Sequence, residues 1–475
     1  MSKILKKWNS LSEPVKSSMV FLLSTVFLKG MIFLTTPIFT RIMSESDMGI
    51  IGTYQSWRGV FEAIAIFSIP AGGIFNVGMS QYRDDRDGYM SNMVCFCAVF
   101  ASISGAFLLF FYDTLESFFM IPRSLIVLMV LYAMIMPAQL FWVARQRYEY
   151  KYRAVFCVTI ISAICSQVFS VVAVMYSTSR LAESRLWATA LVELPFGLFF
   201  MFLIISRGRK LFSKLIWKST LIFTIPLIPH YLSSIVLTAS DRIMINALDC
   251  SANAGIYTVI HSVGAVTTII WGAIQASVTP YIYDKLDAKD YSGIDKMAEK
   301  TVVGFGIMSM LICLMAPEAV RILGPESYYI GVYAVPPIIG AIFISALYNL
   351  FSAVEFYHMK SVFIAFASCV ASIFNVVLNY IFIPKYGFVV AGYTTLVSYI
   401  LLSMMHYFNM RRIEKVDIFN SKRLILISSL LLLLCILPTV LYDKVILRYM
   451  VVALIVLVGI LKKDIIITLF QRKNN

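Results

Sequence analysis

Charged residues are scarce in this chain. Asp, Glu, Lys and Arg make up 14% of its 475 residues, whereas about 25% is usual in a soluble globular protein. Hydrophobic residues reach 60%, and so few charged residues cannot cover the cores that would be needed to hide that much apolar surface. The composition therefore argues against a soluble enzyme, a disordered scaffold or a soluble nucleic-acid binder.

Long polar segments are also lacking. The longest expected loop, 281–300, has 20 residues with interspersed Asp and Lys, which indicates a solvated connector on the cytoplasmic face. No loop is long enough for a soluble catalytic domain. Seven of the 8 cysteines lie in apolar stretches, where a small buried hydrophobe is their ordinary role. We expect no enzymatic activity and no cofactor.

Long apolar stretches dominate the sequence instead. A helix needs about 20 apolar residues to cross roughly 30 Å of hydrocarbon, and the stretches do not alternate polar with apolar residues as barrel strands do. We therefore expect an all-α polytopic membrane protein. The fourteen expected spans are 17–39, 51–75, 90–112, 124–143, 154–177, 185–206, 219–240, 255–278, 301–316, 331–352, 361–383, 388–408, 424–441 and 446–461.

Basic residues are distributed unevenly between the two sides of the membrane. An even number of spans puts both termini on one side, and 29 of the 40 Lys and Arg residues fall in the segments on that side. Such a bias marks the cytoplasmic face. The distribution thus predicts both termini in the cytoplasm. The net charge of +14 then indicates contact with anionic membrane lipids and not nucleic-acid binding.

The chain also resembles itself at a lag of about 200 residues. The segment 41–43, followed by Gly52-Thr53-Tyr54, recurs as 242–244 followed by Gly255-Ile256-Tyr257. Two parallel six-helix bundles around a central cavity follow, an architecture of transporters. We expect an N-terminal bundle at 1–206, a basic cytoplasmic linker at 207–218, a C-terminal bundle at 219–410, and two additional helices with a cytoplasmic tail at 411–475.

Ionisable and polar residues inside spans are the main functional signal, because a charge at mid-membrane costs roughly 2.5 to 3.5 kcal/mol on insertion scales. They concentrate in the first two spans of each repeat, and Arg58 and Glu62 are spaced to pair on one helix face. The candidate substrate-binding residues are Lys29, Arg41, Gln55, Arg58, His230, Arg242, His261 and Gln275, and the candidate ion-coupling residues are Glu62, Glu193 and Asp241; no metal site is expected.

Each candidate also has a purely structural interpretation. Lys29 could extend its side chain to the membrane surface, although it lies deep in its span. Arg58 and Glu62 could be only a structural pair, the two histidines could be satisfied core residues, and the arginines at the outer span ends could be interfacial anchors. If these polar residues of the spans line a cavity, the electric field in that cavity is positive. Such a cavity suits a phosphate or diphosphate, for which Arg offers a fork of donors and Lys a point charge.

Three segments resemble a known family. Phe33 to Tyr54, FLTTPIFTRIMSESDMGIIGTY, is similar to the first signature of the Wzx-type polysaccharide flippases. The run IPLIPHYLSSIVLTASDRIMI from Ile225 is similar to the second-half signature of that family, and NVVLNYIFIPKYGFVVAGYTT from Asn375 is similar to its eleventh-span motif, with Val-Val-Ala-Gly where Gly-Ala-Ala is more usual. The resemblance covers roughly residues 15 to 410.

The resemblance implies a member of the superfamily of multidrug, oligosaccharidyl-lipid and polysaccharide exporters. It implies translocation of an undecaprenyl-diphosphate-linked oligosaccharide, for O-antigen, capsule or a related polymer, across a bacterial inner membrane by alternating access with H+ or Na+ antiport. Expected partners are that lipid-linked substrate, membrane lipids, the counter-ion, and as candidates a polysaccharide polymerase and a chain-length regulator. No nucleic-acid partner is expected.

Other functions remain open from the sequence. A peptidoglycan-precursor flippase would have the same span count and a cationic cavity, and a multidrug exporter belongs to the same superfamily but needs buried carboxylates facing its substrate. A membrane glycosyltransferase often has an acidic pair in its first outside loop, which Glu45-Ser46-Asp47 fits superficially. A polysaccharide polymerase would need a long outside loop, which the sequence lacks.

Overall fold

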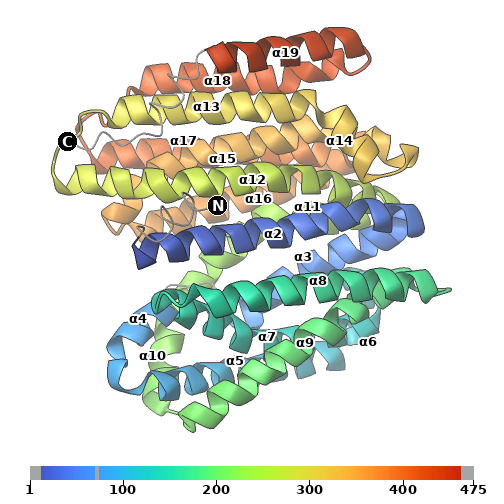
Figure 1. Cartoon of the computed structure of the whole chain (residues 1–475), viewed down its shortest axis with the longest axis vertical. Coiled ribbons are helices and arrows are strands. Elements are labelled where there is room, and N and C mark those ends of the chain that lie inside the picture. Colours follow the sequence, from blue (N-terminus) through green and yellow to red (C-terminus); the bar gives the residue numbers. More distant parts are fainter. Residues whose placement is uncertain (1–11, 70–73, 462–475) are drawn as a thin grey trace, which may run out of the picture. The chain divides into compact units, whose positions relative to one another are not determined.

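The computed structural model describes residues 12–69 and 74–461, and every regular element within these residues is helical (Figure 1). Regular helices satisfy their own backbone hydrogen bonds, as a chain surrounded by hydrocarbon requires. Eleven of the described helical segments are long and apolar enough to cross a membrane. The expectation of an all-α polytopic membrane protein is confirmed.

The contacts within the chain divide it into two compact units, Met1–Gly255 and Ile256–Asn475. The boundary falls within helix α12 (Ser251–Asp287). This division follows contacts, whereas the predicted bundles at 1–206 and 219–410 follow the internal repeat, so the predicted boundaries stay a prediction. The described helices of the first unit before α12 are α2 (Glu13–Ile42), α3 (Glu45–Ala65), α4 (Ile74–Gln81), η1 (Arg83–Asp85), α5 (Arg86–Phe110), α6 (Tyr112–Phe119), α7 (Arg123–Tyr148), α8 (Tyr152–Tyr176), α9 (Leu181–Gly208), α10 (Lys214–Thr224), η2 (Ile225–Leu227) and α11 (Ile228–Leu248).

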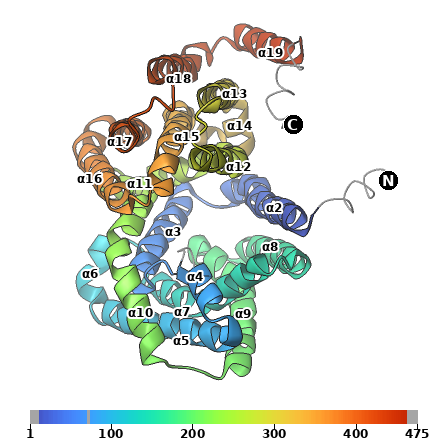
Figure 2. The ribbon, with the colours of Figure 1, turned by 90° about the vertical axis from the view of Figure 1, so that its left-hand side faces the viewer.

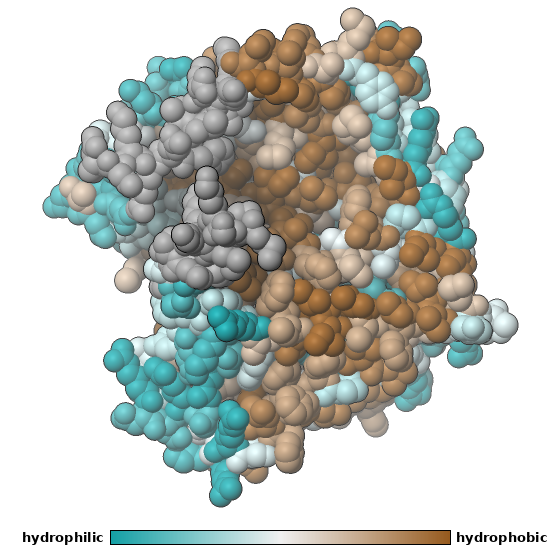
Figure 3. All heavy atoms as spheres, in the orientation of Figure 1, coloured by the Kyte–Doolittle hydropathy of each residue, from teal (hydrophilic) through white to brown (hydrophobic). Residues whose placement is uncertain are grey.

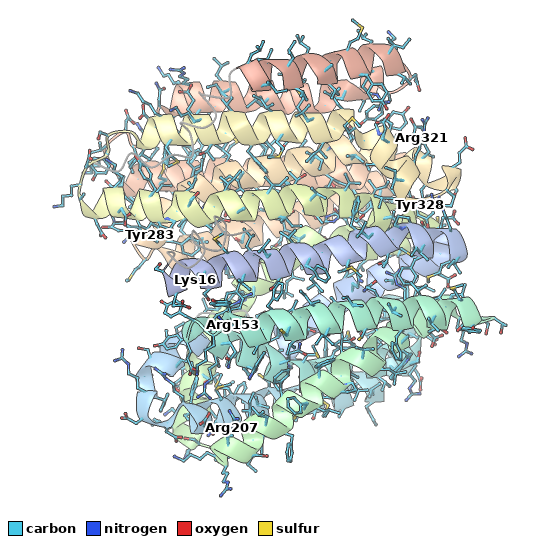
Figure 4. The ribbon with its side chains drawn as sticks, in the orientation of Figure 1. Lys16, Arg153, Arg207, Tyr283, Arg321 and Tyr328 are labelled. Carbon is cyan, nitrogen blue, oxygen red and sulfur yellow. The ribbon has the colours of Figure 1, made fainter. Side chains whose placement is uncertain are left out.

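The first unit packs around α5, α7 and α9. Helix α9 contacts both α7 and α8, α8 contacts α2, and α11 packs against α3. Its core joins aromatic residues of α4, α5 and α7: Phe75 stacks on Phe141 with ring centroids 4.9 Å apart, and Phe96 is fully buried. In Figure 4, Lys16, Arg153 and Arg207, which belong to the predicted inner segments, lie toward the same end of the helices of this unit.

After α12, the second unit contains the following described helices: α13 (Ile294–Leu314), α14 (Ala316–Leu323), η3 (Glu326–Ala334), α15 (Val335–Tyr357), α16 (Ser361–Tyr386), α17 (Val390–Ile413), α18 (Ser421–Ile436), η4 (Leu437–Leu441) and α19 (Val445–Leu461). Helix α15 lies between α13 and α17 when these helices are seen nearly end-on (Figure 2). Arg448 fastens α19 to α14, because its two Nη atoms donate to Glu318 at 2.9 and 2.6 Å. The unit therefore includes the two additional helices predicted at the C-terminus.

The fourteen predicted spans all coincide with described helices, but some of their ends differ. The second span was predicted at 51–75, whereas α3 begins at Glu45 and ends at Ala65, and Phe67 and Ser68 then adopt positive φ. Sequence explains the early end, since Pro70 and two glycines follow and break a helix. Three predicted spans, on α3, α17 and α19, are not among the eleven helical segments that are long and apolar enough to cross a membrane. Helices α3 and α17 are less apolar, and α19 is short.

The predicted loop at 281–300 is wrong, because it is mostly helix. Helix α12 continues to Asp287 and α13 begins at Ile294, which leaves a connector of only a few residues. Hydrogen bonds from Lys285 and Ser292 hold Asp290 in that connector and lower the pKa of its carboxyl to about 2. The interspersed charges therefore cap and close a tight turn.

Apolar side chains remain exposed over the helices. Phe110 and Leu454 are examples, and brown side chains spread over much of the face seen in Figure 3, with hydrophilic ones toward its edges. A soluble protein rarely exposes so much apolar surface. Contact with lipid hydrocarbon accounts for it.

Two glycines allow α3 to pass very close to the start of α12. A Cβ atom on Gly49 would overlap the carbonyl oxygen of Ser251, and one on Gly255 would overlap the carbonyl oxygen of Glu45. Any larger residue would push the two backbones apart. Gly255 is also part of the sequence repeat, so here a repeated residue has a steric function.

We predict opposite effects of Ala at two helical glycines. Gly255→Ala should lower the thermal midpoint of the purified protein, since overpacking costs about 1–3 kcal/mol. Gly30→Ala is the matched control, because nothing lies within 4 Å of its added Cβ and Ala favours a helix by up to about 1 kcal/mol. Equal midpoints for the two variants would contradict the close approach.

A buried acid–base pair links α15 to α17 in the second unit. His406 Nδ1 lies 2.7 Å from Glu355 Oε2, Asn409 donates to Glu355 Oε1 at 2.9 Å, and the Tyr348 ring stacks on the imidazole. The side chains of His406 and Glu355 are 1% and 0% exposed. The pair is thus a structural bond between two core helices.

Removing one partner of this pair should destabilise the protein strongly. Glu355→Ala should cost about 3 kcal/mol, because it leaves buried polar groups without a partner. Glu414→Ala is the matched control: its pair with His358 has the same 2.7 Å length but is more exposed, so the loss should be below about 1 kcal/mol. Thermal midpoints of the two variants measured at equal detergent concentration test this, and similar losses would contradict it.

Candidate functional site

The centre of the candidate site is the pair that the sequence predicted on α3. Arg58 Nε lies 3.2 Å from Glu62 Oε1, one helical turn later, and the predicted pairing is confirmed. The two side chains are 36% and 31% exposed. Neither charge is sealed into a core, so the pair can still be approached by a ligand.

Two residues from other helices complete the surroundings of Arg58. Its guanidinium carbon lies 4.5 Å above the ring of Tyr132 on α7, and the Tyr132 hydroxyl donates a hydrogen bond of 2.8 Å to Glu193 Oε2 on α9. We call Arg58, Glu62, Tyr132 and Glu193 the Arg58 cluster. The structure thereby brings together one predicted substrate-binding residue and two predicted ion-coupling residues.

The charge balance of this cluster differs from the sequence expectation. The sequence suggested a positive field because Lys29 and Arg58 together outweigh Glu62, but Glu193 adds a second carboxylate near Arg58, on the far side of the Tyr132 hydroxyl. Arg58 therefore has two carboxylates around it: Glu62 contacts it directly, and Glu193 is linked to it through Tyr132, whose ring faces the guanidinium and whose hydroxyl bonds to Glu193. An anionic ligand would have to compete with these carboxylates for Arg58.

Lys29 has a different environment. It lies in α2, is half-buried, and its ammonium makes no hydrogen bond or ion pair with another residue in the described part of the chain. Two threonines of the same helix already have hydrogen-bond partners: the Thr25 and Thr36 hydroxyls donate to Phe21 O and Ile32 O of α2 at 3.0 and 2.7 Å. The charge of Lys29 is thus left for a ligand or for the membrane surface to satisfy, as far as the described residues show.

The candidates at the outer ends of the spans are Arg41, Asp241 and Arg242. Arg41 Nη1 donates to Pro37 O at 2.8 Å and is exposed, which is the geometry of an interfacial anchor. Asp241 is buried and Arg242 is half-buried in α11. Their roles in binding or coupling stay a prediction.

The remaining candidates belong to α3, α11 and α12. Gln55 is exposed on α3, and His230 on α11 lies with its ring 5.6 Å from that of Tyr231. In the second unit, His261 lies 6.3 Å from the Tyr257 ring, and Gln275 Nε2 donates to Asn349 at 3.4 Å. The assignment of all eleven residues to one cavity stays a prediction.

Sequence reasoning missed several polar residues. Tyr132 joins Arg58 to Glu193, and His406 pairs with Glu355, but neither Tyr132, His406 nor Glu355 was a candidate. The available signal was a histidine inside the twelfth expected span; Glu355 fell just beyond the tenth. Among the described residues, no group of three or more His, Cys, Asp or Glu side chains is arranged to hold a metal ion.

The acidic loop that fitted a glycosyltransferase has a structural function. Ser44 Oγ accepts from Asp47 N at 3.1 Å, and Asp47 Oδ2 accepts from Ser44 N at 3.3 Å, which forms a capping box at the start of α3. The Asp47 carboxylate thus satisfies the helix end. This observation weakens the glycosyltransferase interpretation.

The fold is similar to that of solved transporters. The lipid II flippase MurJ, in an inward closed conformation, superposes with a TM-score of 0.67 at 16% identity, covering 95% of this chain and 100% of that chain. A mutant of the MATE transporter VcmN from Vibrio cholerae gives a TM-score of 0.52 at 12% identity, and an inward-facing multidrug resistance MATE family transporter of the MOP superfamily gives 0.53 at 13%; each comparison covers 84% of this chain and 96% of the other.

Sequence comparison adds the family. No curated protein is significantly similar to this chain. Residues 15–286, more than half of the chain, match the family described as polysaccharide biosynthesis protein. The resemblance indicated by the sequence motifs is therefore confirmed, and the fold is similar to that of solved transporters. The chain is a multi-pass membrane protein that belongs to the polysaccharide biosynthesis protein family.

Proposed function

We propose that this protein is a flippase that moves an undecaprenyl-diphosphate-linked oligosaccharide from the cytoplasmic to the outer leaflet of a bacterial inner membrane. The observation that carries the proposal is Arg58 of α3, a cation between helices of the first unit whose side chain is 36% exposed and which has one carboxylate within ion-pair distance. Membership of the polysaccharide biosynthesis protein family supports it. The basic inner segments support an orientation with both termini in the cytoplasm.

The diphosphate is the part of this substrate that the two deep cations can recognise. Arg58 offers a planar fork of donors that matches phosphate oxygens, and Lys29 adds a point charge. Lys29 has no polar partner among the described residues, so binding a diphosphate there breaks no existing pair. At Arg58 the diphosphate displaces Glu62.

Competition at Arg58 also supplies a mechanism for ion coupling. When Glu62 is ionised it holds Arg58, and Glu193 adds negative charge nearby; when Glu62 takes up a proton or is screened by a sodium ion, Arg58 is released to the anionic substrate. Proton or sodium binding and substrate binding are thereby linked through one guanidinium. With alternating access, the substrate then binds on one side of the membrane and the ion binds on the other.

The likeness to the lipid II flippase favours a second candidate substrate. The TM-score with that flippase, 0.67, is higher than the scores with the two MATE transporters, 0.52 and 0.53. A peptidoglycan precursor is also a lipid-linked diphosphate. Substrate identity separates the two functions. Loss of a peptidoglycan-precursor flippase blocks cell-wall synthesis, whereas loss of a polysaccharide flippase leaves complete repeat units of the surface polymer on the cytoplasmic side.

Complementation of a deletion strain tests the proposal. Lys29→Ala and Arg58→Ala should each restore less than about a tenth of the surface polysaccharide, because each removes a charge-assisted contact worth roughly 1.5–3 kcal/mol. Arg153→Ala, at the exposed start of α8, is the control and should restore the wild-type level. Immunoblots of membranes check that all three variants are present.

Lipid-linked sugars extracted from the deletion strain complete this test. Accumulated complete repeat units support a flippase. Incomplete units point instead to a glycosyltransferase, and normal polysaccharide in both Ala variants would rule out the assignment of Lys29 and Arg58 to substrate binding.

The coupling mechanism predicts a pH dependence. In the wild type, binding of a diphosphate lipid should strengthen as the pH falls, because protonation of Glu62 releases Arg58. Glu62→Gln removes one competing charge, so its binding should be tighter than wild type at neutral pH and change less with pH; Glu116→Gln on α6, away from the cluster, is the control. Titrations of the purified protein between about pH 5.5 and 8 measure this, and parallel pH profiles for Glu62→Gln and the wild type would contradict it.

A further inference from the structure

A pocket of about 360 Å³ opens between the first half of α2 and the end of α7 in the first unit. Its walls are Ser17, Phe21, Leu22 and Thr25 of α2, with Arg147 and Tyr150 of the α7 end. The four α2 residues are spaced to share one helix face. The pocket shares no residue with the Arg58 cluster.

Arg147 supplies an uncompensated positive charge to this pocket. Its guanidinium carbon lies 4.7 Å above the ring of Phe21, and its side chain makes no ion pair with another residue that the structure describes. Arg145, two positions earlier, contrasts with it: this arginine bonds to Asp87 and, at 2.9 Å, to Glu149. Residues two apart on a helix point in different directions, so Asp87 and Glu149, which pair with Arg145, form no ion pair with Arg147.

Tyr150 adds a hydroxyl in the turn between α7 and α8. The residue has φ 55 and is 51% exposed, and a left-handed conformation is unfavourable for a tyrosine. Its hydroxyl makes no hydrogen bond with another described residue. The pocket thus holds two side chains, Arg147 and Tyr150, that can donate to the oxygens of an anion.

The rim of the pocket identifies the kind of anion. Two residues of the pocket wall, Phe21 and Leu22, are apolar, and Leu22 is 41% exposed, which makes the edge of the pocket on α2 apolar. Lys16 and Arg153, at the starts of α2 and α8, lie toward the same end of these helices in Figure 4, which is also the end with the pocket. A ligand with a phosphate head and hydrocarbon tails fits a cationic pocket with an apolar rim.

We propose that this pocket binds the phosphate of an anionic membrane phospholipid, independently of the transported substrate. Arg147 and Tyr150 hold the phosphate, and the acyl chains lie against Phe21 and Leu22. Because the pocket is built from α2 on one side and the α7 end on the other, the bound lipid stabilises the packing of α2 on this unit. Soluble phosphate lacks the tails and binds much more weakly.

The experiment compares three probes on the purified full-length protein in detergent. Phosphatidylglycerol, phosphatidylcholine and inorganic pyrophosphate are each titrated, with the number of bound molecules measured by native mass spectrometry and the thermal midpoint measured in parallel. We expect phosphatidylglycerol to bind and raise the midpoint, since a ligand that binds only the folded state stabilises it. Phosphatidylcholine should not raise the midpoint at the same concentration, and any rise caused by pyrophosphate should be independent of Arg147.

Variants assign the effect to the pocket. Arg147→Gln should weaken phosphatidylglycerol binding about tenfold, the effect of one charge-assisted hydrogen bond, and Tyr150→Phe should weaken it about threefold. Lys151→Gln is the matched control at the same membrane end, because Lys151 already pairs with Glu149 at 2.6 Å; it should bind as the wild type does. Tyr150→Phe keeps the test decisive if Arg147→Gln folds poorly.

Three results would overturn the proposal. Unchanged phosphatidylglycerol binding in both Arg147→Gln and Tyr150→Phe would place the lipid elsewhere. Equal losses in Lys151→Gln would show a general effect of surface charge. Pyrophosphate binding as strong as that of phosphatidylglycerol, with the same dependence on Arg147, would identify a site for soluble phosphates and no lipid site.

Discussion

Hydrocarbon offers no water to a polar group, so each amide and each charge inside the membrane must find its partner in the protein or in a ligand. This constraint accounts for the helical backbone throughout the described residues. It also accounts for hydroxyls that donate to their own helix, as those of Thr25 and Thr36 do. The cations that have no such partner are the ones left to interact with ligands.

The cations of this chain differ mainly in how they are compensated. Arg448 is satisfied by two bonds to Glu318 and by the carbonyl oxygen of Leu314, and it joins two helices. Arg58 is partly satisfied, by one carboxylate and an aromatic face. Lys29 and Arg147 have no acidic partner among the residues that the structure describes. Residue type alone does not separate these cases; the neighbours from other helices do.

The sequence predicted the parts of this structure that depend on local spacing. Fourteen helices and the Arg58–Glu62 pair follow from apolar run length and from i, i+4 geometry. Tyr132 and Glu193 are 74 and 135 positions beyond Arg58 in the chain, so their meeting depends on how α3, α7 and α9 pack. The same holds for Glu355 and His406. The predicted ends of the second span were also wrong, because a cap at Ser44 sets the start of α3 and helix-breaking residues follow its end at Ala65.

Partial exposure is what makes the Arg58 cluster suited to binding and release. A guanidinium that is fully buried and bonded, such as that of Arg448 at 1% exposure, could reach a ligand only if two hydrogen bonds and a helix contact broke first. A fully exposed one would bind an anion weakly, because water and salt screen it. With 36% of its side chain exposed and a 3.2 Å contact to one carboxylate, Arg58 lies between these limits. In the proposed mechanism an anion then replaces Glu62, and the charge of Glu62 decides which of them Arg58 holds.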